Sequence, residues 1–325
     1  MSLAPPTKVV LDLRGVRLSL ERDALMELPE SVLLCLFPNG VVLTPQRQPG
    51  APDDGEEDVY FVDFDSKCLE YVLDFFGTAR DSFYGAGGEG ARRDLSFNSP
   101  LAHSSMQNPL FLKQAIIVLR EELEYFAIPP SRPPVGSASG ETALSALHPG
   151  TDDSGKPNAA LSQLKIDCGN ALLEHRSIFT ALQRNVSRDN NVAEQHLIDM
   201  LCMSGFERDD LWGYRALEPS RCCIASIALV LLKTGISHSA SAENHSDAAS
   251  PSSENGPAFS EDGTGGMQVD AQQLATAQKL LLFWRKPARK CWWDATNVVV
   301  RAGTDKEETL KVWARRVWTL ELSLI

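Results

Sequence analysis

The sequence predicts an α+β fold, with strands near its start and near its end and helices between them. Val16, Leu18 and Leu20 alternate with polar residues, which is typical of a strand with one buried face. After Asp65, apolar residues recur at helical spacing as far as Phe76, which predicts a helix packed on that sheet. A second alternation lies in the tail and places four residues on one face of a strand: Trp318, Leu320, Leu322 and Leu324.

Length and composition allow two domains. The chain has 325 residues, of which 43% are hydrophobic, enough for more than one packed core. Stretches rich in Pro, Gly, Ser or Asn predict a linker over 131–158 and a disordered insert over 237–270. We therefore expect an N-terminal domain over 7–130 and a C-terminal α+β domain over 159–325.

The N-terminal domain is expected to begin with a tight turn between two strands, because Gly15 supplies the backbone freedom that a short connection needs. A third strand is expected at 60–65. Near the end of this domain, Asn108 and Pro109 suit the cap and first turn of a helix. Its apolar stripe is Leu112, Ile116, Leu119, Leu123 and Phe126. Pro129 would end it.

The C-terminal domain is expected to place its helices first. Apolar periodicity predicts a long helix over 159–186 and a second over 192–203, which Gly205 would end. Apolar residues of both parities at 222–232 fit either a central strand or a buried helix, and β-branched residues favour the strand. Three further strands are expected at 280–284, 296–301 and 310–324.

The order of the N-terminal elements resembles the BTB/POZ fold of the KCTD adaptors and of the potassium-channel T1 domain. The segment 121–129 also resembles the closing helix of T1-like domains. The chain departs from that family where Arg14 precedes Gly15 instead of a second glycine, where Leu18 replaces an aromatic residue, and in two long inserts at 46–58 and 85–107. The resemblance implies a domain that binds proteins, that can self-associate, and that catalyses nothing.

Three motifs in the second half resemble the fungal Whi-two-type growth regulators. They are Arg221-Cys222-Cys223-Ile224, the segment Arg289 to Asp294, and the segment Arg315 to Glu321. This resemblance implies a general stress response protein that partners a plasma-membrane phosphatase and restrains nutrient-driven growth.

Charge and cysteine content disfavour other classes. With 43 acidic and 31 basic residues the net charge is −12, which disfavours a nucleic-acid binder. Seven irregularly spaced cysteines indicate reduced thiols inside the cell. There is no sign of a secretory signal, and the longest apolar run, 224–232, is too short to span a bilayer. We expect a cytoplasmic protein that a partner recruits to the plasma membrane.

One group of residues has the chemistry of metal ligands. His196, Cys202, Cys222 and Cys223 have nearly the spacing of a zinc motif found in some T1 domains. Six positions along a helix, however, turn the first two about 120° apart, away from a shared ion. Buried structural cysteines are the preferred interpretation, and we expect neither a metal nor a cofactor.

Asp63 and Asp65, at a strand end, are the main candidates for catalysis. Haloacid-dehalogenase-type phosphatases place a nucleophilic aspartate at such an end. Here Lys67 stands where that pattern needs Thr or Val, and no later magnesium-binding motif follows. Capping of the next helix by Asp65 is the simpler interpretation, so we expect no enzymatic activity.

Tryptophans are concentrated in the tail. Trp318 shares its strand parity with apolar residues, so we expect it to be buried. Trp292 and Trp293 are adjacent and must point to opposite faces of a strand, which leaves one of them accessible. An exposed Trp beside Arg289 and Lys290 has the composition of an interface hot spot. These two tryptophans and two cations are the partner-binding candidates.

The sequence therefore predicts a non-enzymatic adaptor in stress response and nutrient-dependent growth control that binds and activates a phosphatase. A substrate adaptor of a cullin-RING ubiquitin ligase is the alternative, because KCTD-like proteins often have that role. A phosphatase that uses Asp63 and Asp65 is the third possibility.

Overall fold

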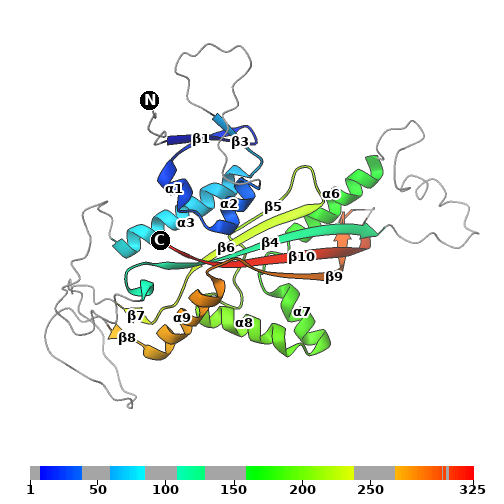
Figure 1. Cartoon of the computed structure of the whole chain (residues 1–325). Helices are drawn as coiled ribbons and strands as arrows, with labels where there is room; N and C mark the ends of the chain where they lie inside the picture. Colours follow the sequence, from blue (N-terminus) through cyan, green and yellow to red (C-terminus); the bar gives the residue numbers. More distant parts are fainter. Residues whose placement is uncertain are drawn as a thin grey trace, which may run out of the picture.

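The computed structural model describes residues 8–38, 59–84, 108–128, 159–237, 268–301, 303–304 and 307–325. Its central feature is a five-stranded antiparallel sheet (Figure 1). In spatial order the strands are β5 (Tyr214–Leu217), β6 (Cys223–Leu231), β4 (Ala115–Ile128), β10 (Glu308–Leu324) and β9 (Ala288–Val300). Together with the helices described below, this sheet confirms the α+β class.

A smaller sheet forms the N-terminal unit. Its middle strand β1 (Lys8–Leu13) pairs antiparallel with β2 (Val16–Glu21) and parallel with β3 (Val59–Val62). Arg14 and Gly15 make the two-residue turn with φ of 53° and 93°, the left-handed values that such a hairpin needs. Three helices lie between this sheet and the large one (Figure 1): α1 (Arg22–Met26), α2 (Glu30–Leu36) and α3 (Ser66–Tyr84).

Apolar packing and polar contacts fix the N-terminal unit to one face of the large sheet. Four residues of β4 and β6 share a core with α3: Ile116, Val118, Ile227 and Leu229. The Glu321 carboxylate of β10 accepts hydrogen bonds from the backbone N–H groups of Glu30 and Ser31 at 2.8 and 2.9 Å. It therefore satisfies donors at the start of α2 that have no partner within the helix. Arg120 of β4 donates to the Ser31 carbonyl at 2.9 Å.

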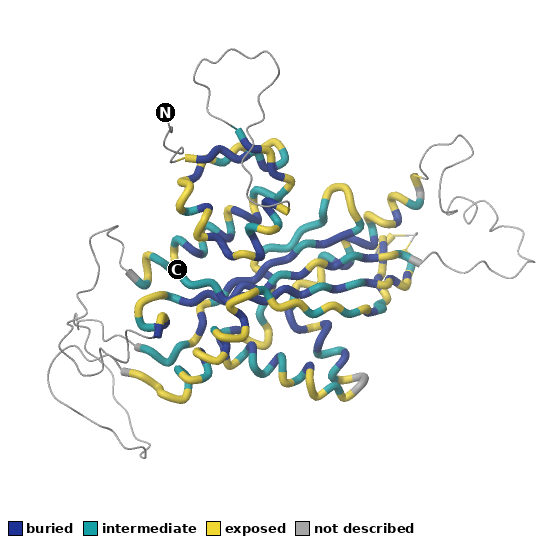
Figure 2. The backbone as a smooth tube through the Cα atoms, viewed as in Figure 1, coloured by how far each residue is buried: buried dark blue, intermediate teal, exposed yellow. Residues whose placement is uncertain are grey.

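Helices cover the opposite face of the large sheet. They are α6 (Ala159–Leu173), α7 (Thr180–Asp189), α8 (Val192–Ser204) and α9 (Ala271–Trp284). In Figure 1, α7, α8 and α9 lie below the sheet, away from the N-terminal unit. Side chains of α6 pack farther along the same face, where Leu164 and Leu172 join a core with Leu123 and Val312. Figure 2 shows the central strands buried along much of their length.

Three short elements complete the described fold. The 3-10 turn η1 (Pro109–Phe111) precedes β4, and the Asn108 side chain accepts a hydrogen bond from the N–H of Leu110. β7 (Ile236–Ser237) pairs antiparallel with β8 (Gln268–Val269), so both ends of the expected insert 237–270 are ordered strands. The other expected inserts, at 46–58 and 85–107, and the linker 131–158 lie outside the described residues.

The helix expected from Asn108 to Phe126 is wrong, because this segment forms η1 and then the long strand β4. For the same reason residues 121–128 are not the closing helix of a T1-like domain, which this segment was expected to resemble. Residues 115–119 are all fully buried, since at this point both faces of the sheet are covered. A strand buried on both faces has apolar residues at both parities, and a subset of them falls at helical spacing. β4 lies between β6 and β10, so the expected boundary after residue 130 assigns a central strand of the large sheet to the N-terminal domain.

Two expectations for the second half also need correction. Residues 280–284 were expected to form a strand but end α9, which begins where the Asp270 side chain accepts hydrogen bonds from two backbone N–H groups. The helix expected over 159–186 is interrupted, because Arg176 and Ile178 make backbone hydrogen bonds to Trp212 and Asp210. The helix expected over 192–203, its end at Gly205 and the strand at 222–232 are confirmed.

Candidate protein-interaction surface

Trp292 and Trp293 point to opposite faces of β9. Trp292 faces the helices, where its ring meets Trp318 edge-on with 5.6 Å between centroids. Trp318 is 3% exposed and also meets Trp212 edge-on at 6.0 Å. Trp293 is 57% exposed on the other face, and its ring lies 5.8 Å from that of Phe126. The expectations that Trp318 is buried and that one of the adjacent pair is accessible are confirmed.

The face that carries Trp293 is the one on which the N-terminal unit packs, but this unit leaves part of it open. The open part has a cluster of exposed apolar side chains, which we call the aromatic face. It consists of Phe126, Trp293, Trp313 and Val299, which are 51%, 57%, 41% and 46% exposed. These residues come from β4, β10 and β9, which are adjacent in the sheet. Trp313 pairs in register with Phe126 on one side and with Ala295 on the other, so the three rings form one surface.

Charged groups surround this surface. The Lys311 ammonium lies 5.3 Å from the centroid of the Trp313 ring, a cation–π distance. Arg315 lies between Glu124 and Trp293 in the register and forms a 3.4 Å ion pair with Glu124. Arg289 is exposed on the same side of β9 as Trp293. The aromatic face is therefore bordered by three cations, Lys311, Arg315 and Arg289.

The structure separates the four residues predicted to bind a partner. Trp293 and Arg289 lie on the open side of β9, whereas Trp292 and Lys290 lie on the helical side. The Lys290 ammonium pairs with Glu194 of α8 at 3.1 Å. The sequence analysis predicts only Trp293 among the four members of this surface and misses Trp313, Phe126 and Val299. The strand parity of Trp313, opposite to that of buried Trp318, is a signal in the sequence that could identify it. Phe126 is missed because the sequence predicts a helix there.

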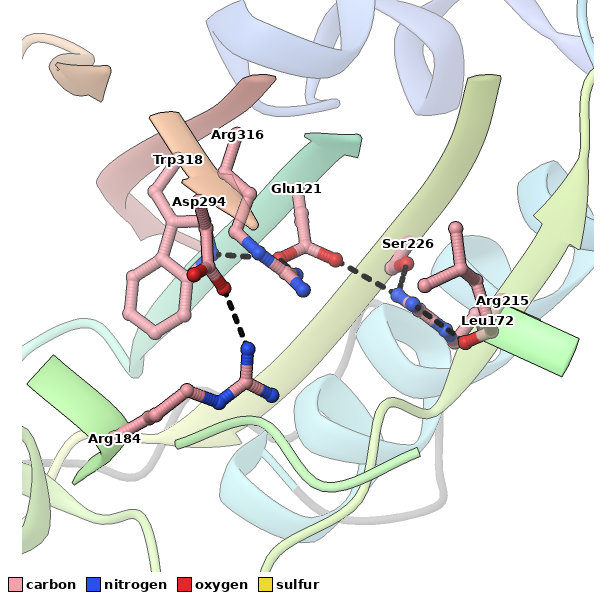
Figure 3. Close-up of polar contacts among 8 residues, drawn as sticks. All are labelled: Glu121, Leu172, Arg184, Arg215, Ser226, Asp294, Arg316 and Trp318. Carbon is pink, nitrogen blue, oxygen red and sulfur yellow. Dashed lines mark hydrogen bonds and ion pairs between the residues drawn. The ribbon is translucent and has the colours of Figure 1, made fainter. Parts of the chain in front are cut away.

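A network of buried charges lies on the helical side of the same strands (Figure 3). The Glu121 carboxylate accepts hydrogen bonds from Arg316 at 2.7 Å, from Arg215 at 2.8 Å and from the indole N–H of Trp318 at 3.1 Å. Arg215 also donates to Ser226 at 2.6 Å. The network joins four neighbouring strands, β5, β6, β4 and β10, so it holds them in one register.

The charge of Glu121 is stabilised despite its burial. Burial by itself would raise the pKa of this carboxyl group, but Arg316, Arg215 and the hydrogen bonds lower the pKa below its ordinary value. Asp294 is buried nearby and accepts a 2.8 Å hydrogen bond from Arg184 of α7. His175, on the same side, has a lowered pKa, first because of burial and then because of the positive charges of the neighbouring arginines.

Asp63 and Asp65 both have structural partners. One oxygen of Asp65 accepts hydrogen bonds from the backbone N–H groups of Lys67 and Cys68 at 2.9 and 3.2 Å, so Asp65 caps the start of α3 as predicted. Asp63 accepts a 2.6 Å hydrogen bond from Arg14, which also pairs with Glu218 at 2.6 Å. Through Arg14, Asp63 thus helps to join the first turn to Glu218, which follows β5 of the large sheet, whereas these hydrogen bonds of Asp65 lie within the N-terminal unit.

The residues of the predicted zinc-like spacing belong to different elements. His196 and Cys202 lie in α8, whereas Cys223 begins β6 and Cys222 precedes it. Within the described ranges, no three side chains of His, Cys, Asp or Glu are grouped as metal ligands would be. None of the described helices is long and apolar enough to cross a membrane.

Comparison with known proteins places the chain in a family. It is 32% identical to a WHI2-like protein of Schizosaccharomyces pombe over 96% of this chain and 86% of that protein. The chain belongs to the WHI2-like family. This WHI2-like chain is also 27% identical to the Growth regulation protein of Saccharomyces cerevisiae, over 94% of the chain and 88% of the relative. A third relative, an uncharacterized protein of S. pombe, is 21% identical over 98% and 88% of the two chains. No family profile and no solved structure matches.

Proposed function

We propose that this WHI2-like protein is a non-enzymatic adaptor in growth control and stress response, and that it binds its partner through the aromatic face. The observation that carries the proposal is the exposure of Trp293, Phe126 and Trp313 together on three adjacent strands. Single exposed apolar residues are common on soluble proteins, but a contiguous group of rings indicates an interaction site. Trp and Phe are also enriched in the central parts of protein interfaces.

The position of these rings favours binding. They stand on long paired strands, and the buried network around Glu121 holds the same strands from the other side. Side chains on a rigid sheet lose less conformational freedom on binding than side chains on a loop, so more of the contact energy is left for affinity.

Two observations support growth control as the process. The chain is similar over most of its length to a protein named for growth regulation, and its C-terminal motifs resemble growth regulators that partner a plasma-membrane phosphatase. We therefore propose a phosphatase as the partner that the adaptor binds and activates. The adaptor would act in the cytoplasm and reach the plasma membrane through this partner.

Replacement in yeast tests this proposal. Saccharomyces cerevisiae lacking its Growth regulation protein would express the wild-type chain, Trp293→Ala or Phe283→Ala, and cell density would be followed through nutrient exhaustion. Phe283 is a matched control, because it is an exposed aromatic residue on α9, away from the aromatic face, and is 70% accessible against 57% for Trp293. The wild type and Phe283→Ala should remove the growth difference between the deleted and parent strains, and Trp293→Ala should not. Equal behaviour of the two variants would contradict a role for the aromatic face.

A cullin-RING substrate adaptor is the second candidate. Its support is the N-terminal unit, whose hairpin, helices, third strand and long helix follow the element order of the BTB/POZ resemblance. Crosslinking of the tagged chain in cells, followed by mass spectrometry, separates the candidates. A phosphatase that is captured by the wild type and lost in Trp293→Ala supports the first function, whereas a cullin captured equally by both proteins supports the second.

We propose no catalytic role for Asp63 and Asp65, because both carboxylates are engaged in structural hydrogen bonds. The purified chain is then expected to hydrolyse no phosphoester with magnesium present. Hydrolysis that is lost in Asp63→Asn would establish the phosphatase alternative instead.

A further inference from the structure

β9 is an edge strand beside the aromatic face. It pairs with β10 on one side, and in the described residues no strand pairs with its other side. Such an edge presents a row of backbone N–H and C=O groups that can pair with another chain. Toward its end, β9 approaches α6, where Arg301 forms a 2.8 Å ion pair with Asp167. The accessible part of the edge is therefore the first half, from Arg289 to Ala295.

This half of the edge lacks features that usually prevent strand addition. Edge strands are commonly protected by outward-pointing lysines, by proline or by a β-bulge. Here Lys290 turns toward α8, the register with β10 is continuous from Ala288 to Val300, and no proline interrupts the strand. Trp293 lies within this half, and its ring is exposed.

The charged groups near the free edge of β9 indicate which kind of peptide segment could bind there. On the aromatic face, the acidic groups Glu122 and Glu124 already pair with Arg120 and Arg315. Among the described residues, no ion pair engages the two remaining cations of this face, Arg289 and Lys311. Two more exposed cations, Arg285 and Lys286, come just before β9. Arg289 and Lys311 thus make this surface locally basic, and Arg285 and Lys286 add positive charge before the start of the edge strand. The net charge of the whole chain is −12, so the complement of this basic region is acidic.

We propose that an extended, acidic segment of a partner protein adds as a strand to the free edge of β9, with an apolar side chain against Trp293. Backbone pairing along β9 supplies affinity, and the tryptophan and cations supply selectivity. About seven paired residues would cover roughly 24 Å of edge, a usual strand length. This inference rests on the proposed function, because it specifies how the aromatic face recognises its partner.

A random peptide library tests the inference with the full chain as bait. Displayed peptides of about ten residues would be selected on the wild type, with Trp293→Ala as the counter-selection and Phe283→Ala as the matched control. The expected enrichment is in acidic residues alternating with β-branched or aromatic ones. The best peptide should bind Phe283→Ala as it binds the wild type, should lose about tenfold in affinity for Trp293→Ala, and should weaken with added salt.

Backbone methylation then distinguishes strand addition from other modes. Two versions of the best peptide carry N-methyl groups at odd or at even positions. A strand exposes alternate amides to its neighbour, so only one version should lose binding. Enrichment of basic or helical peptides, equal binding of both methylated versions, or no enrichment at all would overturn the inference. These results would leave the yeast replacement test unaffected, so a failure of strand addition and a failure of the adaptor function are distinguishable.

Discussion

Replacing Glu121 with Gln removes one charge from the centre of the large sheet while keeping the shape of the side chain. Its side chain is 2% exposed and accepts hydrogen bonds from two guanidinium groups and one indole. Without the carboxylate, Arg215 and Arg316 stay buried without a counter-charge. Breaking a buried ion pair by removing one partner costs about 3–5 kcal/mol, a large share of a typical stability of roughly 5–15 kcal/mol.

The adjacent residue supplies the control. Glu122 points to the other face of β4, its side chain is 50% exposed, and it forms a 3.4 Å ion pair with Arg120. Exposed pairs of this kind contribute about 0–1 kcal/mol, so Glu122→Gln should hardly change the free energy of unfolding. Urea unfolding followed by tryptophan fluorescence measures both variants. Similar losses in the two variants would refute the argument that the network around Glu121 holds the strands together.

The same pair of variants predicts a pH dependence. The pKa of Glu121 is lower in the folded chain than in the unfolded chain, so its contribution to stability is present above the unfolded pKa, about 4.3. This contribution is lost as the pH falls through the lower, folded pKa. The difference in stability between wild type and Glu121→Gln should therefore shrink in acid. A difference that stays constant down to about pH 2 would contradict this.

Other parts of the molecule give three further predictions. Trp318→Ala should lower the melting temperature by on the order of 10 °C, because it leaves a cavity between the rings of Trp212 and Trp292. Trp293→Ala should leave the melting temperature nearly unchanged, and equal shifts would contradict the finding that Trp318 is buried while Trp293 is exposed. A fragment that stops at residue 130 should aggregate or stay unfolded, since β4 loses both neighbours; a monodisperse folded fragment in light scattering would disprove this. A thiol reagent should label exposed Cys291 in the native chain and should reach Cys68 only after unfolding, because burial raises the pKa of Cys68 to about 12. Peptide mass spectrometry measures the labelling, and fast labelling of Cys68 in the native chain would exclude this packing.

Several elements could be predicted from the sequence because their signals are local. The alternation in 310–324 identified β10, and the adjacent positions of Trp292 and Trp293 fixed their opposite directions. The helix start after Asp65 follows from capping by a side chain two or three residues away. In each case the contact or the alternation that determines the structure involves residues only a few positions apart in the sequence.

The parts that could not be predicted depend on contacts between distant segments. β4 has apolar residues at both parities, and only its two sheet neighbours, from 223–231 and 308–324, make it a strand. Glu121 meets Arg215 and Arg316 across 94 and 195 residues of sequence. The aromatic face likewise needs Phe126 beside Trp293, which depends on the β4–β10–β9 order. Nothing local in the sequence encodes that order.

The strand order also has a consequence for how the chain is made. β10 follows β4, β5, β6 and β9 in the sequence, yet it lies between β4 and β9 in the sheet. β4 contains five consecutive buried apolar residues. During synthesis it therefore has no β10 to pair with until the residues from 308 onward have left the ribosome. Folding that depends on such distant pairing is slow and exposed to aggregation. A premature stop before β10 should therefore leave cells with insoluble protein, not with a shortened but folded chain, so such alleles would behave as complete losses of function.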